Sequence, residues 1–317
     1  MYHDKGSFIT LAIIPLLGVK QLIVIGGPAS NNLEQKIAKL LQVPSLKVYH
    51  KVFPDNESYI RLDKADIVSN QDVIIVQSLY PPQDKHFVEL LLLVDLVRDY
   101  NAKSVTTVVP YLAYSRQDKR FLEGEPISVK TILNSLSTIG VDYFITVDIH
   151  NRDSLKYFKG KGAFDVTAIP VIADYVKENI DLNDLLVLAP DKGALWRAKE
   201  LASLLGLEYD YLEKFRDRYT GEVRVKPKSL DVKGKKVLII DDIISTGGTI
   251  ALATRESLRQ GAREVYVACT HALLVGSAIE KLKNAGITQL IATDTMPSPY
   301  SSVSVAPVIA KKLKEVI

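Results

Sequence analysis

The chain has 317 residues, of which 47% are hydrophobic and 24% are charged. These values are typical of a folded protein of about two domains and exclude intrinsic disorder, which requires low hydrophobicity and high net charge. The net charge of +3 is too small to indicate a nucleic-acid-binding or membrane surface. The single cysteine, Cys269, excludes an intrachain disulfide and favours a reducing, cytoplasmic location. Because Cys269 lies in an apolar run, we interpret it as part of the core.

An apolar run at residues 8–17 raises the question of a signal peptide. Asp4 offsets the charge of Lys5 ahead of the run, Pro15 interrupts it, and no small-residue cleavage site follows. The run is also too short to span a bilayer. We therefore interpret residues 1–19 as an N-terminal extension or a start codon placed too early, with secretion as the weaker alternative.

Short apolar runs alternate with helical patterns along most of the chain. Because polar residues do not alternate with apolar ones inside these runs, they predict strands that are covered on both faces. We expect strands at residues 22–25, 73–77, 105–109, 143–147, 185–189, 237–240, 265–269 and 290–292, and helices at residues 32–41, 87–100, 194–205 and 249–260. This order predicts an α/β protein whose mainly parallel sheets are flanked by helices.

An internal repeat divides the chain into two similar halves. Residues 72–78 resemble residues 236–242, and residues 101–109 resemble residues 261–269. The repeat predicts two related domains. We expect an N-terminal domain at residues 20–165 and a C-terminal domain at residues 166–317, with the last helix packed on the first domain.

The two copies differ where a site is expected. Gln77 and Ser78 stand where the second copy has Asp241 and Asp242. The first copy therefore lacks an acidic pair that the second copy has.

A strand that leads into the acidic pair and then into Ser-Thr-Gly-Gly-Thr is the strongest functional pattern. Gly247 and Gly248 let the backbone approach a ligand, and free N–H groups at the start of the following helix bind anions. The hydroxyls of Ser245, Thr246 and Thr249 add donors. The acidic pair would repel a phosphate, so we expect it to face a neutral polyol or a metal. The alternative is an ordinary turn in which a threonine caps the helix.

Polar side chains that suit a nucleotide and a metal follow other predicted elements. Asp148 and His150 end the strand at 143–147, where an oxygen and a nitrogen ligand on one side of the chain can hold a Mg²⁺–triphosphate. Arg116 offers a planar fork for phosphate oxygens. Phe53 precedes two carboxylates within five residues, a set that suits a base and a ribose. The alternatives are a structural histidine, a solvated run of charges and an ordinary turn.

Two cations on one strand suit phosphoryl chemistry. Lys214 and Arg216 are two residues apart and point the same way if the segment is extended. Cations there would stabilise charge that develops on a transferred group. The turn-like residues after Arg218 are expected to form a mobile flap.

Together these segments resemble ribose-phosphate pyrophosphokinases from about Lys20 onward. The 245–249 loop resembles the ribose-5-phosphate loop of the type I phosphoribosyltransferase fold, although Ser245 stands where many members have Asp. The resemblance implies two tandem domains of that fold, Mg²⁺ as cofactor, a homo-oligomer, and neither a nucleic acid nor a membrane as partner.

The resemblance also implies a role for each matching residue. Catalysis is expected from Lys214 and Arg216. ATP binding is expected from Phe53, Asp55, Glu57, Arg116, Gln117 and His150. Ribose 5-phosphate binding is expected from Asp241, Asp242, Ser245, Thr246, Gly247, Gly248 and Thr249. Metal binding is expected from Asp148, His150 and Asp191, and Asp191 is alternatively a helix N-cap, a role compatible with the first.

The reaction that the resemblance implies is transfer of the β,γ-diphosphate of ATP to O1 of ribose 5-phosphate, for nucleotide biosynthesis. A phosphoribosyltransferase that consumes the diphosphate is the alternative among enzymes, but the sequence has no recognisable base-recognition hood. A silent regulatory paralogue is the alternative outside catalysis. Loss of Lys214, Arg216 or Asp148 would indicate it, and all three residues are present.

Overall fold

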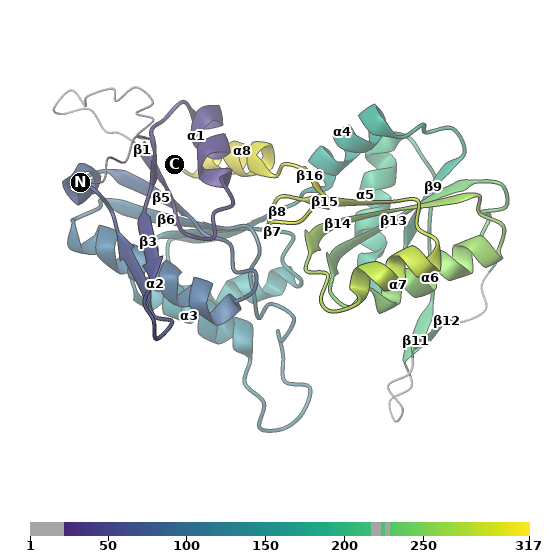
Figure 1. Ribbon diagram of the computed structural model, residues 1–317, viewed down its shortest axis with the longest axis horizontal. Helices are drawn as coiled ribbons and strands as arrows, with labels where there is room; N and C mark the ends of the chain where they lie inside the picture. Colours follow the sequence, from purple (N-terminus) through teal and green to yellow (C-terminus); the bar gives the residue numbers. More distant parts are fainter. Residues whose placement is uncertain (1–21, 217–222, 226–228) are drawn as a thin grey trace.

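The computed structural model describes residues 22–216, 223–225 and 229–317, with side chains left undescribed at 214–216 and 223–225. It has two lobes side by side, each built on a six-stranded parallel sheet with helices against its faces (Figure 1). The predicted α/β class is thereby confirmed.

The first lobe contains the N-terminal sheet, in the order β2-β1-β5-β6-β7-β8. Its strands are β1 (Leu22–Gly26), β2 (Ser45–Lys47), β5 (Asp72–Val76), β6 (Ser104–Val109), β7 (Tyr143–Val147) and β8 (Gly162–Val166). Its helical segments are α1 (Leu33–Leu41), η1 (Ala65–Val68), α2 (Gln83–Asp99), α3 (Ser128–Thr138) and η2 (Arg152–Tyr157). A separate antiparallel hairpin, β3 (Tyr49–Val52) and β4 (Ser58–Arg61), stands beside α2.

The second lobe repeats this arrangement, in the order β10-β9-β13-β14-β15-β16. Its strands are β9 (Leu185–Ala189), β10 (Tyr209–Tyr211), β13 (Lys236–Ile244), β14 (Glu264–Ala272), β15 (Gln289–Thr293) and β16 (Ser301–Val303). Its helical segments are α4 (Ile169–Asn179), η3 (Lys192–Ala194), α5 (Leu195–Leu205), α6 (Gly248–Arg259) and α7 (Ala278–Ala285). The last helix of the chain, α8 (Ala306–Val316), follows β16. A second hairpin pairs β11 (Lys214–Arg216) with β12 (Val223–Val225).

The predicted repeat is visible in the strand orders. β5 and β13 are the third strands of their sheets, and β6 and β14 are the fourth, as the similar sequence segments indicate. Each of the eight expected strands is present. The two largest differences from the expected bounds are that α2 begins at Gln83 instead of residue 87, and that β13 runs to Ile244, so that Asp241 and Asp242 lie inside the strand.

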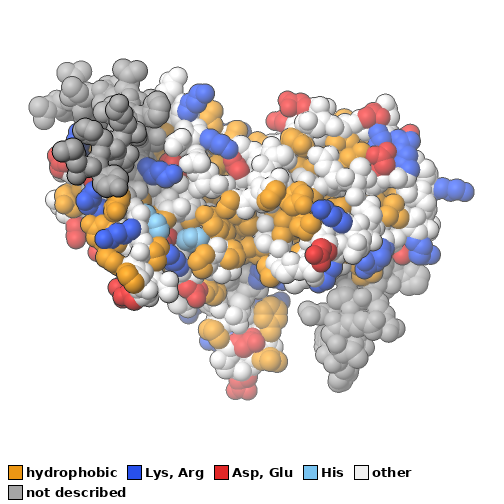
Figure 2. Space-filling view, viewed as in Figure 1, with side chains coloured by type: hydrophobic (Ala, Val, Ile, Leu, Met, Phe, Trp, Pro, Cys, Tyr) orange, Lys and Arg blue, Asp and Glu red, His pale blue; other side chains and the backbone are white. Residues whose placement is uncertain are grey.

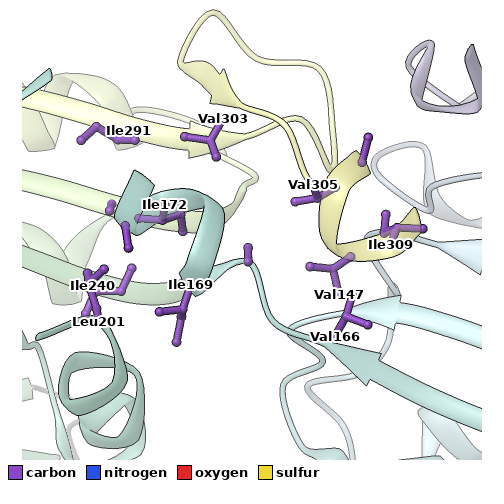
Figure 3. Close-up of a cluster of buried hydrophobic side chains, with 14 of the residues drawn as sticks. Val147, Val166, Ile169, Ile172, Leu201, Ile240, Ile291, Val303, Val305 and Ile309 are labelled. Carbon is purple, nitrogen blue, oxygen red and sulfur yellow. The ribbon is translucent and has the colours of Figure 1, made fainter. Parts of the chain in front are cut away.

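The core follows from strands that are apolar on both faces. In β1, Ile23 and Ile25 pack into a cluster under α2 and α3, while Val24 packs into a second cluster on the opposite face. The second cluster continues across the junction between the lobes, where Val147 and Ile240 belong to the same set of buried side chains (Figure 3). The two sheets therefore share one core. Cys269 is buried in the remaining core of the second lobe, as predicted.

The last helix crosses from the second lobe to the first. α8 follows β16 in sequence but lies beside α1 (Figure 1). Its Ile309 and Leu313 share a core cluster with Leu33 and Ile37 of α1. Asp294, which precedes α8, accepts a hydrogen bond of 2.6 Å from Lys36 of α1. The C-terminal segment of the chain thus crosses the junction and packs on the first lobe.

The surface agrees with the small net charge. On the described residues of the face in Figure 2, acidic and basic side chains are interspersed over both lobes. Among the described residues, no helix combines the length and the apolar character that a membrane crossing requires.

Candidate functional site

A cavity of about 420 Å³ lies between the two lobes. The first lobe lines it with the loop after β6 and the end of β7, and the second lobe lines it with the segment after β9 and the end of β13. Parallel sheets place the carboxyl ends of their strands at one edge, which is where ligands of this architecture bind. The cavity is therefore the candidate active site.

The phosphate-binding pattern forms a turn that only glycine adopts without strain. Gly247 has φ 74° and is the residue that precedes α6. A Cβ at this position would also lie 3.2 Å from the carbonyl oxygen of Ala278. Because Gly247 has no side chain to cap α6, the first N–H groups of the helix stay available to an anion. The alternative in which Thr246 or Thr249 caps the helix is therefore wrong.

The acidic pair lies beside a histidine from the first lobe and an arginine from the second. Asp242 is buried, and its Oδ2 lies 3.0 Å from Nδ1 of His150 and 3.4 Å from Nη2 of Arg197. Although burial acts to raise the pKa of Asp242, the hydrogen bond from His150 and the charge of Arg197 hold it below its ordinary value. Burial and the adjacent Asp242 raise the pKa of Asp241. Asp242 is thus the member of the pair that keeps its charge.

His150 and Asp148 differ in their surroundings although they end the same strand. His150 is exposed and lines the cavity. Asp148 is buried, and its Oδ2 accepts hydrogen bonds from the Thr270 hydroxyl (2.6 Å) and the Ala168 amide (2.9 Å). Its Oδ1 has no hydrogen-bond partner among the described residues. Asp148 therefore ties β7 to β14 across the junction, and its role as a metal ligand stays a prediction.

Asp191 both lines the cavity and caps a helical turn. Its Oδ1 accepts hydrogen bonds from the amides of Gly193 (2.7 Å) and Ala194 (3.2 Å) at the start of η3. Asp191 therefore caps η3, which leads into α5, whereas the N-cap of α5 itself is Ala194, without a side-chain hydrogen bond. The metal-binding interpretation stays a prediction because the two roles are compatible.

The adjacent residues Arg116 and Gln117 have different surroundings. Arg116 is exposed and lines the cavity. Gln117 does not line it; its Oε1 accepts a hydrogen bond of 2.7 Å from Ser128 at the start of α3. In this arrangement Arg116 faces the candidate site and Gln117 holds the loop that carries it.

The predicted nucleotide loop lies at the tip of the β3–β4 hairpin. Phe53, Asp55 and Glu57 are exposed there, and none of them lines the cavity of the same chain. The tip is closed by a hydrogen bond of 2.8 Å from the Phe53 amide to the Glu57 carbonyl. These residues are therefore free to contact a ligand or another chain.

The predicted catalytic cations belong to the β11–β12 hairpin. Lys214 and Arg216 are the first and last residues of β11, which confirms the extended backbone expected for them. Their side chains lie outside the described part of the chain, and so do residues 219–222, the start of the flap predicted after Arg218.

Arg197 is a site residue that the sequence interpretation misses. It is buried, lines the cavity, and its Nε has no hydrogen-bond partner among the described residues. It lies on the buried face of α5 between Ala194 and Leu201. A charge on an otherwise apolar helix face requires a partner, and this signal, together with the predicted helix, points to Arg197.

The lobes are matched by two family models. Residues 22–140 match the N-terminal domain of ribose phosphate pyrophosphokinase, and residues 166–291 match the phosphoribosyl transferase domain.

Curated relatives match almost the whole chain. The ribose-phosphate pyrophosphokinase of Sulfurisphaera tokodaii is 49% identical over 92% of this chain and 100% of its own length. That of Pyrococcus furiosus is 43% identical over 92% of this chain and 100% of its own length. Among solved structures, phosphoribosylpyrophosphate synthetase from Mycobacterium smegmatis matches with a TM-score of 0.82 at 31% identity, covering 94% of this chain and 99% of that one.

Proposed function

Because the chain belongs to the ribose-phosphate pyrophosphokinase family, we propose that it transfers the β,γ-diphosphate of ATP to O1 of ribose 5-phosphate. The products are 5-phospho-α-D-ribose 1-diphosphate and AMP. The observation that carries the proposal is the cavity in which an anion-binding turn and an acidic pair from one lobe face Arg116 and His150 from the other.

Ribose 5-phosphate occupies the second-lobe side of the cavity. Its phosphate accepts hydrogen bonds from the backbone at 245–249 and from the hydroxyls of Ser245, Thr246 and Thr249. Its 2- and 3-hydroxyls donate to Asp241 and Asp242. The negative charge that Asp242 keeps supports this orientation, because a charged carboxylate accepts a hydroxyl proton more strongly than a neutral one.

ATP occupies the first-lobe side. Arg116 and His150 contact its phosphates, and Gln117 completes the loop. Phe53, Asp55 and Glu57 bind the base and ribose in the cavity of a neighbouring subunit, so that the active form is a homo-oligomer. Their exposure on the hairpin and their separation from the cavity of their own chain support an intersubunit role.

The donor set fits a magnesium ion that arrives with the triphosphate. His150 and Asp191 line the cavity, and Asp148 is buried two residues before His150. The described side chains form no cluster of three or more acidic, histidine or cysteine ligands. Mg²⁺ is held by few protein ligands and completes its shell with phosphate oxygens and water. When bound, it neutralises charge on the β- and γ-phosphates.

Transfer requires no covalent intermediate with the protein. O1 of the sugar attacks the β-phosphorus, loses its proton, and the bond from the β-phosphorus to the α,β-bridging oxygen breaks as AMP leaves. Lys214 and Arg216 stabilise the charge that develops on the transferred group. The remaining residues position the two substrates in line. We expect this reaction to serve nucleotide biosynthesis in the cytoplasm.

The test is to incubate the protein with Mg·ATP and ribose 5-phosphate and to quantify the nucleotide and sugar products. We expect AMP and phosphoribosyl diphosphate in equal amounts, and AMP only when the sugar phosphate is present. ADP in place of AMP would mean transfer of a single phosphoryl group. Saturable binding without turnover, followed through the fluorescence of the single tryptophan, Trp196, which lies next to Arg197 at the cavity, would mean a regulatory paralogue.

A further inference from the structure

The β3–β4 hairpin is not part of either large sheet. Among the described strands, β3 and β4 pair only with each other. Buried apolar residues that flank it, Val48 and Leu62, attach its base to the core of the first lobe. Apolar contacts are not directional, so the direction in which the hairpin projects depends on its polar contacts.

Those polar contacts converge on one buried carboxylate, Glu89, in the middle of α2. Its Oε1 accepts a hydrogen bond of 2.7 Å from the hydroxyl of Ser58 at the start of β4. The same oxygen lies 3.0 Å from Nε2 of His50 in β3, at ion-pair distance but without the alignment of a hydrogen bond. Its Oε2 accepts a hydrogen bond of 3.3 Å from Gln77. Two of the three contacts thus come from the hairpin.

Glu89 occupies a position where an apolar residue would otherwise be expected. The buried face of α2 consists of His86, Glu89 and four apolar residues: Leu90, Leu93, Val94 and Val97. Glu89 is 0% exposed, and burial of a carboxylate is costly unless it is hydrogen-bonded or paired. Its partners compensate this cost and at the same time impose a geometry on the hairpin, because hydrogen bonds are directional.

Gln77 fixes the other side of the carboxylate to the sheet. It follows β5, its Oε1 accepts a hydrogen bond of 2.8 Å from the Ala29 amide, and its Nε2 donates to the His86 carbonyl (3.2 Å). Gln77 corresponds in the internal repeat to Asp241 of the acidic pair. Where the second lobe binds sugar, the first lobe therefore holds an anchor for its hairpin.

We propose that Glu89 is a positioning residue for the nucleotide loop, acting through Ser58 and His50 to set the direction in which the hairpin presents Phe53, Asp55 and Glu57. This inference rests on the proposed function, which assigns ATP binding to that loop. It adds that ATP affinity depends on a buried contact made by Ser58, which directly follows Glu57 but is not itself one of the proposed ligand-binding side chains.

The test compares three single-residue variants, two at Ser58 and one control at Ser104. Ser58→Ala removes the hydrogen bond to Glu89, and Ser58→Thr keeps it. Ser104→Ala is the matched control, because Ser104 also donates to a carboxylate of the first lobe, Asp72 (2.5 Å), but at the amino end of β5, away from the hairpin. The steady-state KM of each substrate and kcat are measured for each variant.

We expect Ser58→Ala to raise the KM for ATP roughly five-fold, with the KM for ribose 5-phosphate unchanged and kcat within about two-fold. Ser58→Thr should restore the KM for ATP, and Ser104→Ala should leave it unchanged. Hydrogen exchange should be faster in the hairpin at 49–61 in Ser58→Ala only. If Ser58→Ala matches Ser104→Ala in the KM for ATP, or raises both KM values equally, the contact only supports stability and the inference is overturned.

Binding of α,β-methylene-ATP, measured by titration calorimetry, separates this inference from the proposed function. A wild-type protein that binds the analogue but makes no AMP from ATP would overturn the proposed function alone. A Ser58→Ala protein with the wild-type dissociation constant would overturn the inference alone. A dissociation constant raised roughly five-fold and restored in Ser58→Thr would support it whatever the turnover.

Discussion

Asp165 is a carboxylate whose surroundings oppose its charge. It is largely buried in β8; its Oδ1 accepts a hydrogen bond from the Ile149 amide (2.8 Å) and its Oδ2 one from Arg152 (2.7 Å). Burial, and next the charge of Asp148, raise the pKa of Asp165 to about 6 despite these two donors. The charged form is therefore tolerated near neutral pH and is not favoured by folding.

A pH-dependent stability follows from that pKa. A raised pKa contributes stability that is fully present below the ordinary value of 3.8 and is lost as the pH rises through about 6. We expect the free energy of unfolding of the wild type, relative to Asp165→Asn, to fall by roughly 3 kcal/mol across that window. Urea unfolding of both proteins between pH 4 and pH 7 measures the difference, and a difference that does not change with pH would contradict it.

Lys214 is the residue whose removal most directly tests the chemistry. A cation that contacts the transferred group stabilises the transition state more than bound substrate. We expect Lys214→Ala to lower kcat roughly 100- to 1,000-fold with little change in either KM. Lys119→Ala, at an exposed position in the loop that carries Arg116, is the control. A raised KM with kcat preserved would instead assign Lys214 to substrate binding.

At the level of single residues, the part of the candidate site that can be predicted from sequence is the part whose residues are adjacent in the chain. The acidic pair and the 245–249 turn are adjacent in sequence, so one strand and one helix start define them. Arg197 enters the same cavity from α5, and only the folded chain brings it to 3.4 Å from Asp242. Likewise, the burial of Asp148 depends on Thr270, 122 residues away, and cannot be read from the local pattern Asp-x-His.

Gly247, in the turn between β13 and α6, must both adopt a positive φ and leave room for the carbonyl oxygen of Ala278. Gly247 and Gly206 both have a positive φ, 74° and 69°, but only at Gly247 would a Cβ meet another group. We expect Gly247→Ala to cost about 1–2 kcal/mol of stability and to raise the KM for ribose 5-phosphate at least roughly ten-fold, because the phosphate turn shifts. Gly206→Ala should carry a similar conformational cost without the change in KM. Equal kinetics for the two variants would contradict a phosphate-binding role for the turn.

At the level of elements, burial decides which strands are predictable. The central strands are apolar on both faces because helices cover both sides of each sheet, and all of them are expected from sequence. β2 and β16 are three residues long and partly exposed, so their composition does not distinguish them from loops. The hairpin β3–β4 is held by Glu89 of α2, a contact between segments that no local pattern connects.

The whole molecule places its candidate substrates between lobes that share one core. Val147 and Ile240 lie in a single buried cluster (Figure 3). Asp148 and Thr270 are hydrogen-bonded across the junction. With α8 fastened to α1, the two lobes have little freedom to close over a ligand as independent bodies. We expect the site to be completed by two segments that project from the lobes, the β3–β4 and β11–β12 hairpins (Figure 1).

If the active site is shared between subunits, two inactive variants should restore activity when they are mixed, which is not expected if each chain has a complete site of its own. If the nucleotide loop acts in the cavity of a neighbour, a chain with Glu57→Ala and a chain with Lys214→Ala carry their defects in complementary places. In a mixed dimer, one of the two sites then receives an intact loop and an intact Lys214, while the other receives both defects.

Each variant alone should be nearly inactive, and an equal mixture allowed to exchange subunits should recover about one quarter of wild-type activity. The measurement is AMP formation before and after co-refolding of the two variants. Recovery that stays absent, although exchange is demonstrated with differently tagged chains, would mean that the hairpin binds ATP within its own chain and that a movement of the hairpin, not a second subunit, completes the site.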